Sequence, residues 1–233
     1  VVYLSGFQPA VDDAIATVDA QALDAADVVD LDLAAADDGH DHGPDEEAGH
    51  DEEAGHDEEA GVDPHFWLDP TRLSEVVEAV ADSLSELDPD NEEAYRANAA
   101  DAVADLEALD REFEAGLADC ESRDLVTSHQ AFGYLAQRYD LEQVGISGLS
   151  PEEEPSAADL AEVVEFVKDR NVRTIYFETL ISPAVAETVA SETGARTAVL
   201  DPIEGLSDAS EGADYLEVMR SNLASIRTGQ PCT

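Results

Sequence analysis

In the second half of the chain, short apolar runs alternate with amphipathic helical segments. Runs of this kind suit buried strands, and the helices between them suit crossover connections between parallel strands. The expected strands, each with the helix that follows it, are residues 125–128 with 130–139, 141–146 with 156–170, 174–177 with 182–194, and 197–200 with 211–227. We therefore predict a (β/α)4 lobe over residues 119–233, with a parallel sheet flanked by helices.

Two helices are expected ahead of this lobe. Apolar residues recur at helical spacing over residues 71–87, and Asp88 and Pro89 separate this segment from the next one. From Pro89 to about residue 118 the helical period continues without an internal proline. Because a helix of about 30 residues spans roughly 45 Å, we predict that residues 89–118 form one long helix joining two lobes.

The first lobe is predicted to comprise residues 1–88 and to be incomplete in this chain. The chain begins with VVYLSG, a buried-strand pattern with no initiator methionine or leader before it. We therefore expect a signal peptide and part of this lobe upstream. No apolar run approaches the roughly 20 residues of a membrane span. The predicted fold class is α/β, with parallel sheets flanked by helices in two lobes that one long α-helix joins.

Histidine is scarce in this chain and concentrated in one segment. Of six histidines, four lie in the acidic repeat of residues 37–61; they are His40, His42, His50 and His56. The repeat contains almost no apolar residues, so we predict a solvated loop outside the core. Imidazole is the commonest metal ligand near neutral pH, and carboxylates supply oxygen ligands. Metal binding is therefore the first functional hypothesis.

The net charge restricts the partners of the chain. With 56 acidic and 11 basic residues, the formal charge is −45 at pH 7. Such a charge excludes unaided binding to nucleic acids or anionic membrane surfaces and favours a cation or a basic protein as partner. Because 44 of the acids lie outside residues 37–61, the folded surface is also acidic, and concentrated salt would screen it. We therefore expect a protein from a salt-loving organism.

Side chains that can bind a metal follow three of the predicted strands. His129, Glu178 and Asp201 each come directly after a strand, and ligands of open parallel sheets bind at the carboxyl ends of the strands. The remaining histidine, His65, lies in a loop that leads to a helix. We predict that these side chains converge on one site.

Each of these residues also has a structural interpretation. His129 could be a hydrogen-bonded core histidine, and His65 a surface histidine at the end of the repeat. Glu178 could cap a helix, and Asp201 could only organise the turn that Pro202 favours. Composition and spacing leave both interpretations open.

Several motifs together resemble one family. They are DPHFWLDP at residues 63–70, NEEAYRANAADAVADLEALDREF at 91–113, SHQAFGYLAQRYDL at 128–141 and AETVASETGARTAVLDPIEGL at 186–206. They resemble the zinc-binding solute receptors of ABC importers, whose two lobes are joined by one long helix. The resemblance extends from VVYLSGFQPAVDDA at residues 1–14 to the C-terminal helix.

The resemblance implies a set of metal ligands. It makes His65 and His129 the metal-binding histidines and Asp201 the metal-binding carboxylate. It places Glu178 near the pocket in a supporting or structural role, without a bond to the metal. The family's first ligand is a histidine upstream of the segment similar to VVYLSGFQPA, so this chain would lack it. The repeat of residues 37–61 matches a family loop near the site entrance that is thought to gather zinc.

The resemblance also implies a function and its setting. The chain would capture Zn(II) between its lobes as a transported ligand and deliver it to an ABC permease with its ATPase. It would act outside the cytoplasm at the cell surface, as a monomer attached to the membrane only through a lipid anchor outside this chain. It would be neither an enzyme nor a nucleic-acid-binding protein.

The ligand types indicate which metal is bound. Two or three imidazoles with one carboxylate favour zinc over manganese, which prefers more oxygen ligands. Manganese-type relatives also tend to carry an acid where His129 stands. Three alternatives stay open: a manganese receptor of the same class, a zinc metallohydrolase with an open coordination position, and a surface metal buffer on an inert fold.

Cys120 and Cys232 are the two cysteines of the chain. They are too few for a disulfide scaffold and form no CxxC pair, so composition leaves one bridge or two free thiols open. An extracytoplasmic receptor, which the resemblance implies, meets oxidising conditions, and each cysteine lies just outside a predicted helix. We therefore predict a disulfide between them.

Overall fold

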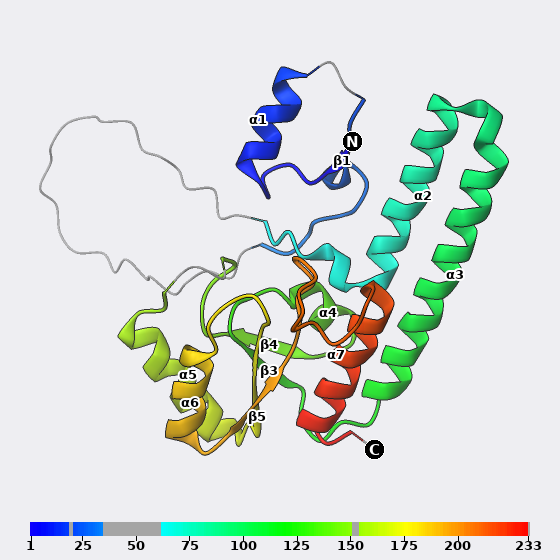
Figure 1. The fold of residues 1–233 in the computed structure, drawn as a ribbon. Helices are drawn as coiled ribbons and strands as arrows, with labels where there is room; N and C mark the ends of the chain where they lie inside the picture. Colours follow the sequence, from blue (N-terminus) through cyan, green and yellow to red (C-terminus); the bar gives the residue numbers. More distant parts are fainter. Residues whose placement is uncertain (19–20, 35–61, 151–153, 233) are drawn as a thin grey trace, which may run out of the picture.

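The computed structural model describes residues 1–18, 21–34, 62–150 and 154–232 (Figure 1). It is an α/β fold with parallel sheets, flanking helices and one long helix, which confirms the predicted fold class. The helices and strands are, in chain order, β1 (Val2–Tyr3), α1 (Pro9–Thr17), β2 (Leu23–Asp24), α2 (Pro70–Leu87), α3 (Glu92–Leu117), β3 (Asp124–Thr127), α4 (Gly133–Arg138), β4 (Glu142–Gly145), α5 (Ala157–Arg170), β5 (Thr174–Phe177), α6 (Ala184–Thr193), β6 (Arg196–Val199) and α7 (Tyr215–Gly229).

The larger sheet lies in the second half of the chain and is entirely parallel. Its strands are ordered β4-β3-β5-β6, and Val126 of β3 is registered with Val144 of β4 on one side and Ile175 of β5 on the other. These are the predicted strands, and their bounds differ from the predicted ones by no more than one residue. Consequently β3, β5 and β6 end side by side at one edge.

Helices cover both faces of this sheet. Leu125 and Tyr176 pack on the face covered by α3, α4 and α7, whereas Val126 and Ile175 pack on the face covered by α5 and α6. Successive strand residues point to opposite faces, so both members of each consecutive pair are buried. These central positions of β3 and β5 therefore serve packing, and candidate ligands come from the strand ends and the loops.

Local signals set several helix ends. The Ser156 hydroxyl accepts a hydrogen bond from the Asp159 backbone N–H, and the Asp159 carboxylate accepts one from the Ser156 N–H, so a capping box begins α5. Asn171 ends α5 at φ 55°, and Gly194 ends α6 at φ 80°. Asparagine and glycine are the residues that tolerate this left-handed conformation best.

α2 and α3 form an antiparallel hairpin that extends away from the larger sheet (Figure 1). The predicted helix over 89–118 is present, but its first turn, Pro89–Asn91, is a separate 3-10 helix. The second half of α3 enters the main core through Leu109, Phe113 and Leu117, which are at most 1% exposed. α3 therefore anchors the hairpin to the second half of the chain.

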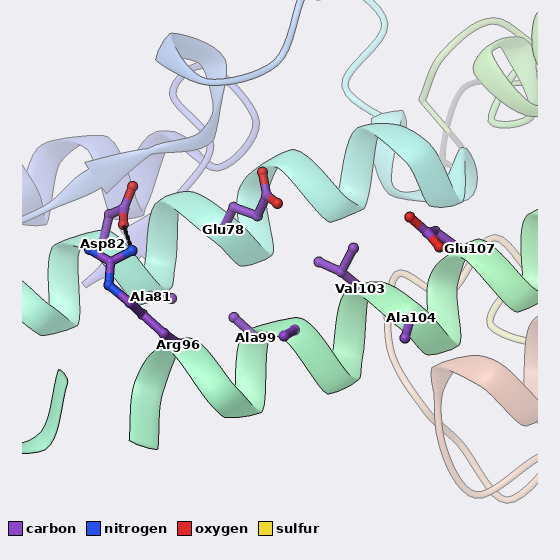
Figure 2. Close-up of a pocket in the computed structure, with 9 residues that line it drawn as sticks. Glu78, Ala81, Asp82, Arg96, Ala99, Val103, Ala104 and Glu107 are labelled. Carbon is purple, nitrogen blue, oxygen red and sulfur yellow. Dashed lines mark hydrogen bonds and ion pairs between the residues drawn. The ribbon is translucent and has the colours of Figure 1, made fainter. Parts of the chain in front are cut away.

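The hairpin carries an open groove of about 550 Å³ between its two helices (Figure 2). Alanines, including Ala81 and Ala99, line it, and Asp82 accepts a hydrogen bond from the Arg96 guanidinium at 2.8 Å across it. Both ionic partners are more than half exposed, so this ion pair contributes little to stability. The groove is open because small side chains line the contact between the two helices.

The beginning of the chain packs on the base of the hairpin and on α4. β1 and β2 pair in parallel, and a separate core cluster joins Val29, Phe66 and Val76 to Tyr134 of α4. Tyr134 is fully buried. Residues that precede the hairpin therefore pack directly against α4, a helix that covers the larger sheet.

Cys120 and Cys232 form a disulfide that connects the end of α3 to the residues after α7. Closing a loop of this size stabilises a protein by about 4 to 5 kcal/mol in the chain-entropy account. Within the described ranges, the helices lack the combination of length and apolar character that a membrane span requires.

Candidate metal centre

His129 lies in the loop that follows β3, at the carboxyl edge of the larger sheet. Its side chain is 1% exposed. Its backbone carbonyl accepts hydrogen bonds from the Thr127 hydroxyl at 2.6 Å and from the Gln143 amide at 3.2 Å. These contacts fix the main chain where the imidazole leaves the strand, so the ring has a defined position.

His65 lies between Pro64 and the 3-10 helix Phe66–Leu68. Its side chain is also 1% exposed, and its ring centroid is 5.4 Å from that of His129. On its outer side, Trp67 contacts the ring at a centroid distance of 5.2 Å. The Trp67 indole N–H in turn donates to the Pro202 carbonyl at 2.8 Å, which fastens this loop to the loop after β6.

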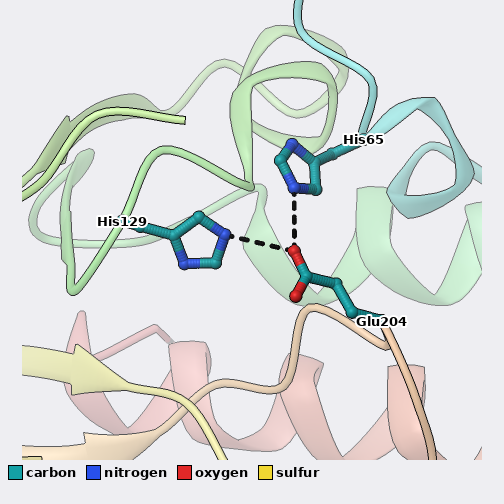
Figure 3. Close-up of side chains that lie close together, drawn as sticks. All are labelled: His65, His129 and Glu204. Atoms are coloured by element: carbon teal, nitrogen blue, oxygen red, sulfur yellow. Dashed lines mark hydrogen bonds and ion pairs between the residues drawn. The ribbon is translucent and has the colours of Figure 1, made fainter. Parts of the chain in front are cut away.

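Glu204 completes a group of three ligand-type side chains (Figure 3). Its Oε1 lies 3.1 Å from Nε2 of His65 and 3.4 Å from Nε2 of His129. One ligand atom from each residue lies within 4.8 Å of the other two, and this is the one such group of three or more His, Cys, Asp or Glu among the described residues. The spacing suits a single metal ion.

A buried carboxylate lies behind each imidazole. The Nδ1 of His65 donates to Asp63 at 2.7 Å, and the Nδ1 of His129 donates to Glu178 at 2.5 Å. Glu178 also accepts from the Ser128 hydroxyl at 2.7 Å. Because a proton on Nδ1 leaves the Nε2 lone pair free in the neutral ring, both histidines present a ligand atom to the centre.

The carboxylates change the proton affinity of the imidazoles. Burial lowers the pKa of His129, but hydrogen bonds and charge from Glu178 and Glu204 outweigh burial and raise it to about 9. Burial also lowers the pKa of His65, but its hydrogen bonds to Asp63 and Glu204 outweigh burial, so the pKa of His65 is raised. Hydrogen bonds to His129 and His65 lower the pKa of Glu204 to about 2. Protons therefore compete with a cation for this centre.

Asp201, the predicted carboxylate ligand, is not a member of this group. Its carboxylate accepts from the Ile203 backbone N–H at 2.9 Å and from the Thr179 hydroxyl at 3.3 Å. Its backbone exchanges hydrogen bonds with the buried Asn222 of α7 at 2.9 and 2.7 Å. The Asp201 carboxylate thus holds the turn after β6, and the acid that lies between the two histidines is Glu204.

The remaining predicted site residues divide into two sets. His65, His129 and Glu178 converge, and Glu178 contacts His129 from behind, as a supporting residue would. The four histidines expected in the loop, His40, His42, His50 and His56, lie outside the described residues.

Sequence reasoning missed Asp63 and Glu204. Both lie inside the motifs that carry the resemblance, two residues before His65 and three residues after Asp201. For Asp63, an acid two residues from a histidine ligand is a signal for the carboxylate that orients the ring. For Glu204, the signal is indirect. The carboxylate of an aspartate directly before proline often hydrogen-bonds to the backbone of its own turn, so the ligand is expected at the next acid along the chain.

Comparison with known proteins identifies a family that this chain matches. Residues 1–229 match the family described as zinc-uptake complex component A, periplasmic (ZnuA). Over 163 residues, 69% of this chain, the sequence is 42% identical to the high-affinity zinc uptake system protein ZnuA of Bacillus subtilis and 46% identical to the zinc-binding lipoprotein AdcA of Streptococcus pneumoniae. The alignments cover 51% and 32% of those two proteins, so the chain spans about half of the first and a third of the second.

Solved structures share the fold. The laminin-binding protein Lbp of Streptococcus pyogenes superposes with a TM-score of 0.80 at 31% identity, over 98% of this chain and 81% of that one. The Zn(II)-bound ZnuA-like domain of Streptococcus pneumoniae AdcA gives a TM-score of 0.71 at 35% identity, over 98% of this chain and 79% of that one.

Proposed function

Since the chain belongs to the zinc-uptake complex component A family, we propose that it captures Zn(II) at the centre of His65, His129 and Glu204 and delivers it to an ABC permease with its ATPase. The observation that carries this proposal is the convergence of two oriented imidazoles and one carboxylate within 4.8 Å. The similarity to a zinc uptake protein and to a zinc-bound domain supports the choice of cargo.

Ligand chemistry supports zinc over manganese. Zinc favours tetrahedral sites with nitrogen ligands, and manganese favours oxygen-rich sites of higher coordination number. The described centre offers two nitrogen atoms and a carboxylate, which leaves a fourth zinc position for water or for a further residue. We propose Zn(II) as the transported ligand.

Carriage fits the surroundings of the centre better than hydrolysis does. In the part of the chain that the structure describes, the carboxylates that contact the two histidines are either hydrogen-bonded behind a ring or placed as a ligand. None of them is therefore left to act as a general base on a zinc-bound water. We propose that the protein is not an enzyme, and a hydrolysis screen with zinc-loaded protein would detect the alternative.

The same family supports a proposal for where the protein acts. We propose an extracytoplasmic receptor at the cell surface, monomeric, with any membrane attachment through a lipid anchor. We also propose two lobes, residues 1–88 and 119–233, with residues 89–118 as the connection and with the repeat of residues 37–61 as a weak zinc collector. The acidic composition supports a halophilic source.

Titration of purified protein with zinc against a competing chelator tests the assignment. His65→Ala and His129→Ala should each weaken the tight site at least ten-fold, which is about 1.4 kcal/mol. His56→Ala is the matched control and should leave the tight site unchanged, because His56 belongs to the repeat. Wild-type affinity in both His65→Ala and His129→Ala would contradict the proposal, and tighter binding of manganese than of zinc would contradict the choice of metal.

A further inference from the structure

Asp63 is held in place from several directions. Its Oδ1 accepts from both the backbone N–H and the Nδ1 of His65, at 2.9 and 2.7 Å. Its own backbone N–H donates to the Leu33 carbonyl at 2.9 Å, and its carbonyl accepts from the Tyr134 hydroxyl at 3.1 Å. Asp63 is 3% exposed, so its carboxylate has one defined position behind His65.

The second carboxylate oxygen of Asp63 lies against Gly133. A Cβ added to Gly133 would be 2.6 Å from Oδ2 of Asp63 and 3.1 Å from a methyl group of Leu33. The first of these distances is shorter than a Cβ atom tolerates. Any side chain at this position would therefore push the carboxylate away from the place in which it holds His65.

Gly133 and Tyr134 belong to the same segment as His129. They lie four and five residues after it, at the beginning of α4. His129 enters the metal centre from the near end of this segment, while Gly133 and Tyr134 contact Asp63 at the far end. One stretch of chain therefore contacts the centre twice, once through a ligand and once through the carboxylate behind the other ligand.

We propose that Gly133 is a positioning residue for zinc binding: it leaves the space in which Asp63 orients the imidazole of His65, with Tyr134 fixing Asp63 from the other side. This inference rests on the proposed function, because it assigns a task toward the same zinc ion. It also explains how residues 128–134 set the geometry of both histidines, since a displacement of α4 would move His129 and release His65 together.

Gly133→Ala is the primary test, with Gly116→Ala as the matched control. Gly116 is also a helical glycine, but its added Cβ would meet only side-chain atoms of Leu223 and Arg227, at 3.1 Å or more. We expect Gly133→Ala to weaken zinc binding at least ten-fold and Gly116→Ala to leave it within about three-fold. Nitrogen-15 NMR of the zinc-loaded protein should show two protected Nδ1–H protons, and Gly133→Ala should lose or shift the one of His65 only.

A double-mutant cycle separates positioning from a loss of packing. If Gly133 acts through Asp63, then Gly133→Ala adds little to the loss already caused by Asp63→Ala, and the two effects are strongly non-additive. Additive losses, or an unchanged His65 Nδ1–H signal in Gly133→Ala, would overturn the proposal.

The Asp63 variants cover the case in which Gly133→Ala does not fold. Asp63→Asn adds no volume and keeps an acceptor for His65. Full zinc affinity in both Asp63→Asn and Asp63→Ala would also overturn the proposal.

The two proposals fail in distinguishable ways. If wild-type protein binds no zinc, the proposed function fails. If wild-type protein binds zinc and His129→Ala loses it, but substitutions at Gly133 and Asp63 leave binding and the His65 signal unchanged, only the positioning role fails.

Discussion

At the scale of single residues, the loop after β6 carries two acids with different roles, Asp201 and Glu204. Asp201 is 2% exposed and its carboxylate is occupied by donors of its own loop and of the loop after β5. Glu204 follows Ile203, which has a left-handed φ of 57°, and this turn directs the glutamate back toward the histidines. The turn that Asp201 stabilises therefore places Glu204, the acid of the proposed metal centre.

This division predicts opposite outcomes for two isosteric substitutions. Glu204→Gln removes the charge from a proposed ligand and should weaken zinc binding at least ten-fold, about 1.4 kcal/mol. Asp201→Asn keeps an acceptor for the Ile203 N–H and should change affinity by less than about three-fold. Competition titrations on both variants measure the difference, and a larger loss in Asp201→Asn than in Glu204→Gln would reverse our assignment.

The raised proton affinity of the histidines predicts a pH dependence of zinc binding. With a pKa of about 9, His129 carries a proton on Nε2 in the metal-free protein at pH 7, and zinc must displace that proton. Binding should therefore release at least one proton at pH 7, and the apparent affinity should rise about ten-fold per pH unit for each displaced proton up to about pH 9.

Calorimetry in two buffers of different ionisation enthalpy counts the released protons. Glu178→Gln keeps an acceptor for His129 but removes the negative charge that raises its pKa, so fewer protons should be released at pH 7. Zinc binding without proton release at pH 7, or an affinity independent of pH between 7 and 9, would contradict the protonated state that we assign to His129.

At the scale of elements, the sequence predicts regular structure better than loop geometry. The parallel strands and their helices follow from the alternation of apolar runs with helical periods, because burial on both faces of a sheet leaves that pattern. The direction of Glu204 depends on the φ of Ile203, a β-branched residue that rarely adopts this conformation. The role of Asp63 depends on a contact with Gly133, which is 70 positions away, and spacing does not encode such contacts.

The ends of the His-rich segment predict what its removal does. Ala34 and Val62 form an antiparallel bridge, and the Asp63 N–H donates to the Leu33 carbonyl at 2.9 Å. A two-residue Asn-Gly turn can therefore join the two sides. Replacing residues 35–61 by Asn-Gly should leave the tight zinc site within about three-fold of wild type and remove only weaker zinc equivalents.

Equilibrium dialysis at low and high free zinc separates the two classes of site. A variant of the full chain with His40, His42, His50 and His56 changed to Asn controls for shortening of the chain. Loss of the tight site in the shortened protein but not in this variant would mean that the segment is needed to hold Asp63 and His65 in place.

At the scale of the whole molecule, several of the few basic residues form ion pairs with nearby acids. Arg138 donates to Asp110 at 2.7 Å and lies 3.2 Å from Glu114, and Arg220 lies 2.9 Å from Glu112. Each of these ion pairs ties α3 to a helix that covers the larger sheet. With 56 acids against 11 bases, such pairs can neutralise only a small part of the acidic charge of the chain.

This imbalance predicts that folding depends on salt. The Debye length falls from about 10 Å at 0.1 M salt to about 3 Å at 1 M, so molar KCl should relieve the repulsion between neighbouring carboxylates. We expect Tm to rise by on the order of 10 °C between 0.1 and 2 M KCl, which corresponds to roughly 3 kcal/mol for a domain of this size. Circular dichroism melts measure this shift.

A variant with fewer surface charges distinguishes screening from a general effect of concentrated solute. Glu86, Glu93 and Asp101 are exposed on the α2–α3 hairpin and its ends, and changing them to Gln, Gln and Asn lowers the charge without touching the metal centre. Because less repulsion remains to be screened, this variant should be more stable than wild type at 0.1 M KCl and should gain less from added salt. Equal gains in the two proteins, or a wild-type Tm that does not change between 0.1 and 2 M KCl, would contradict a salt-adapted surface.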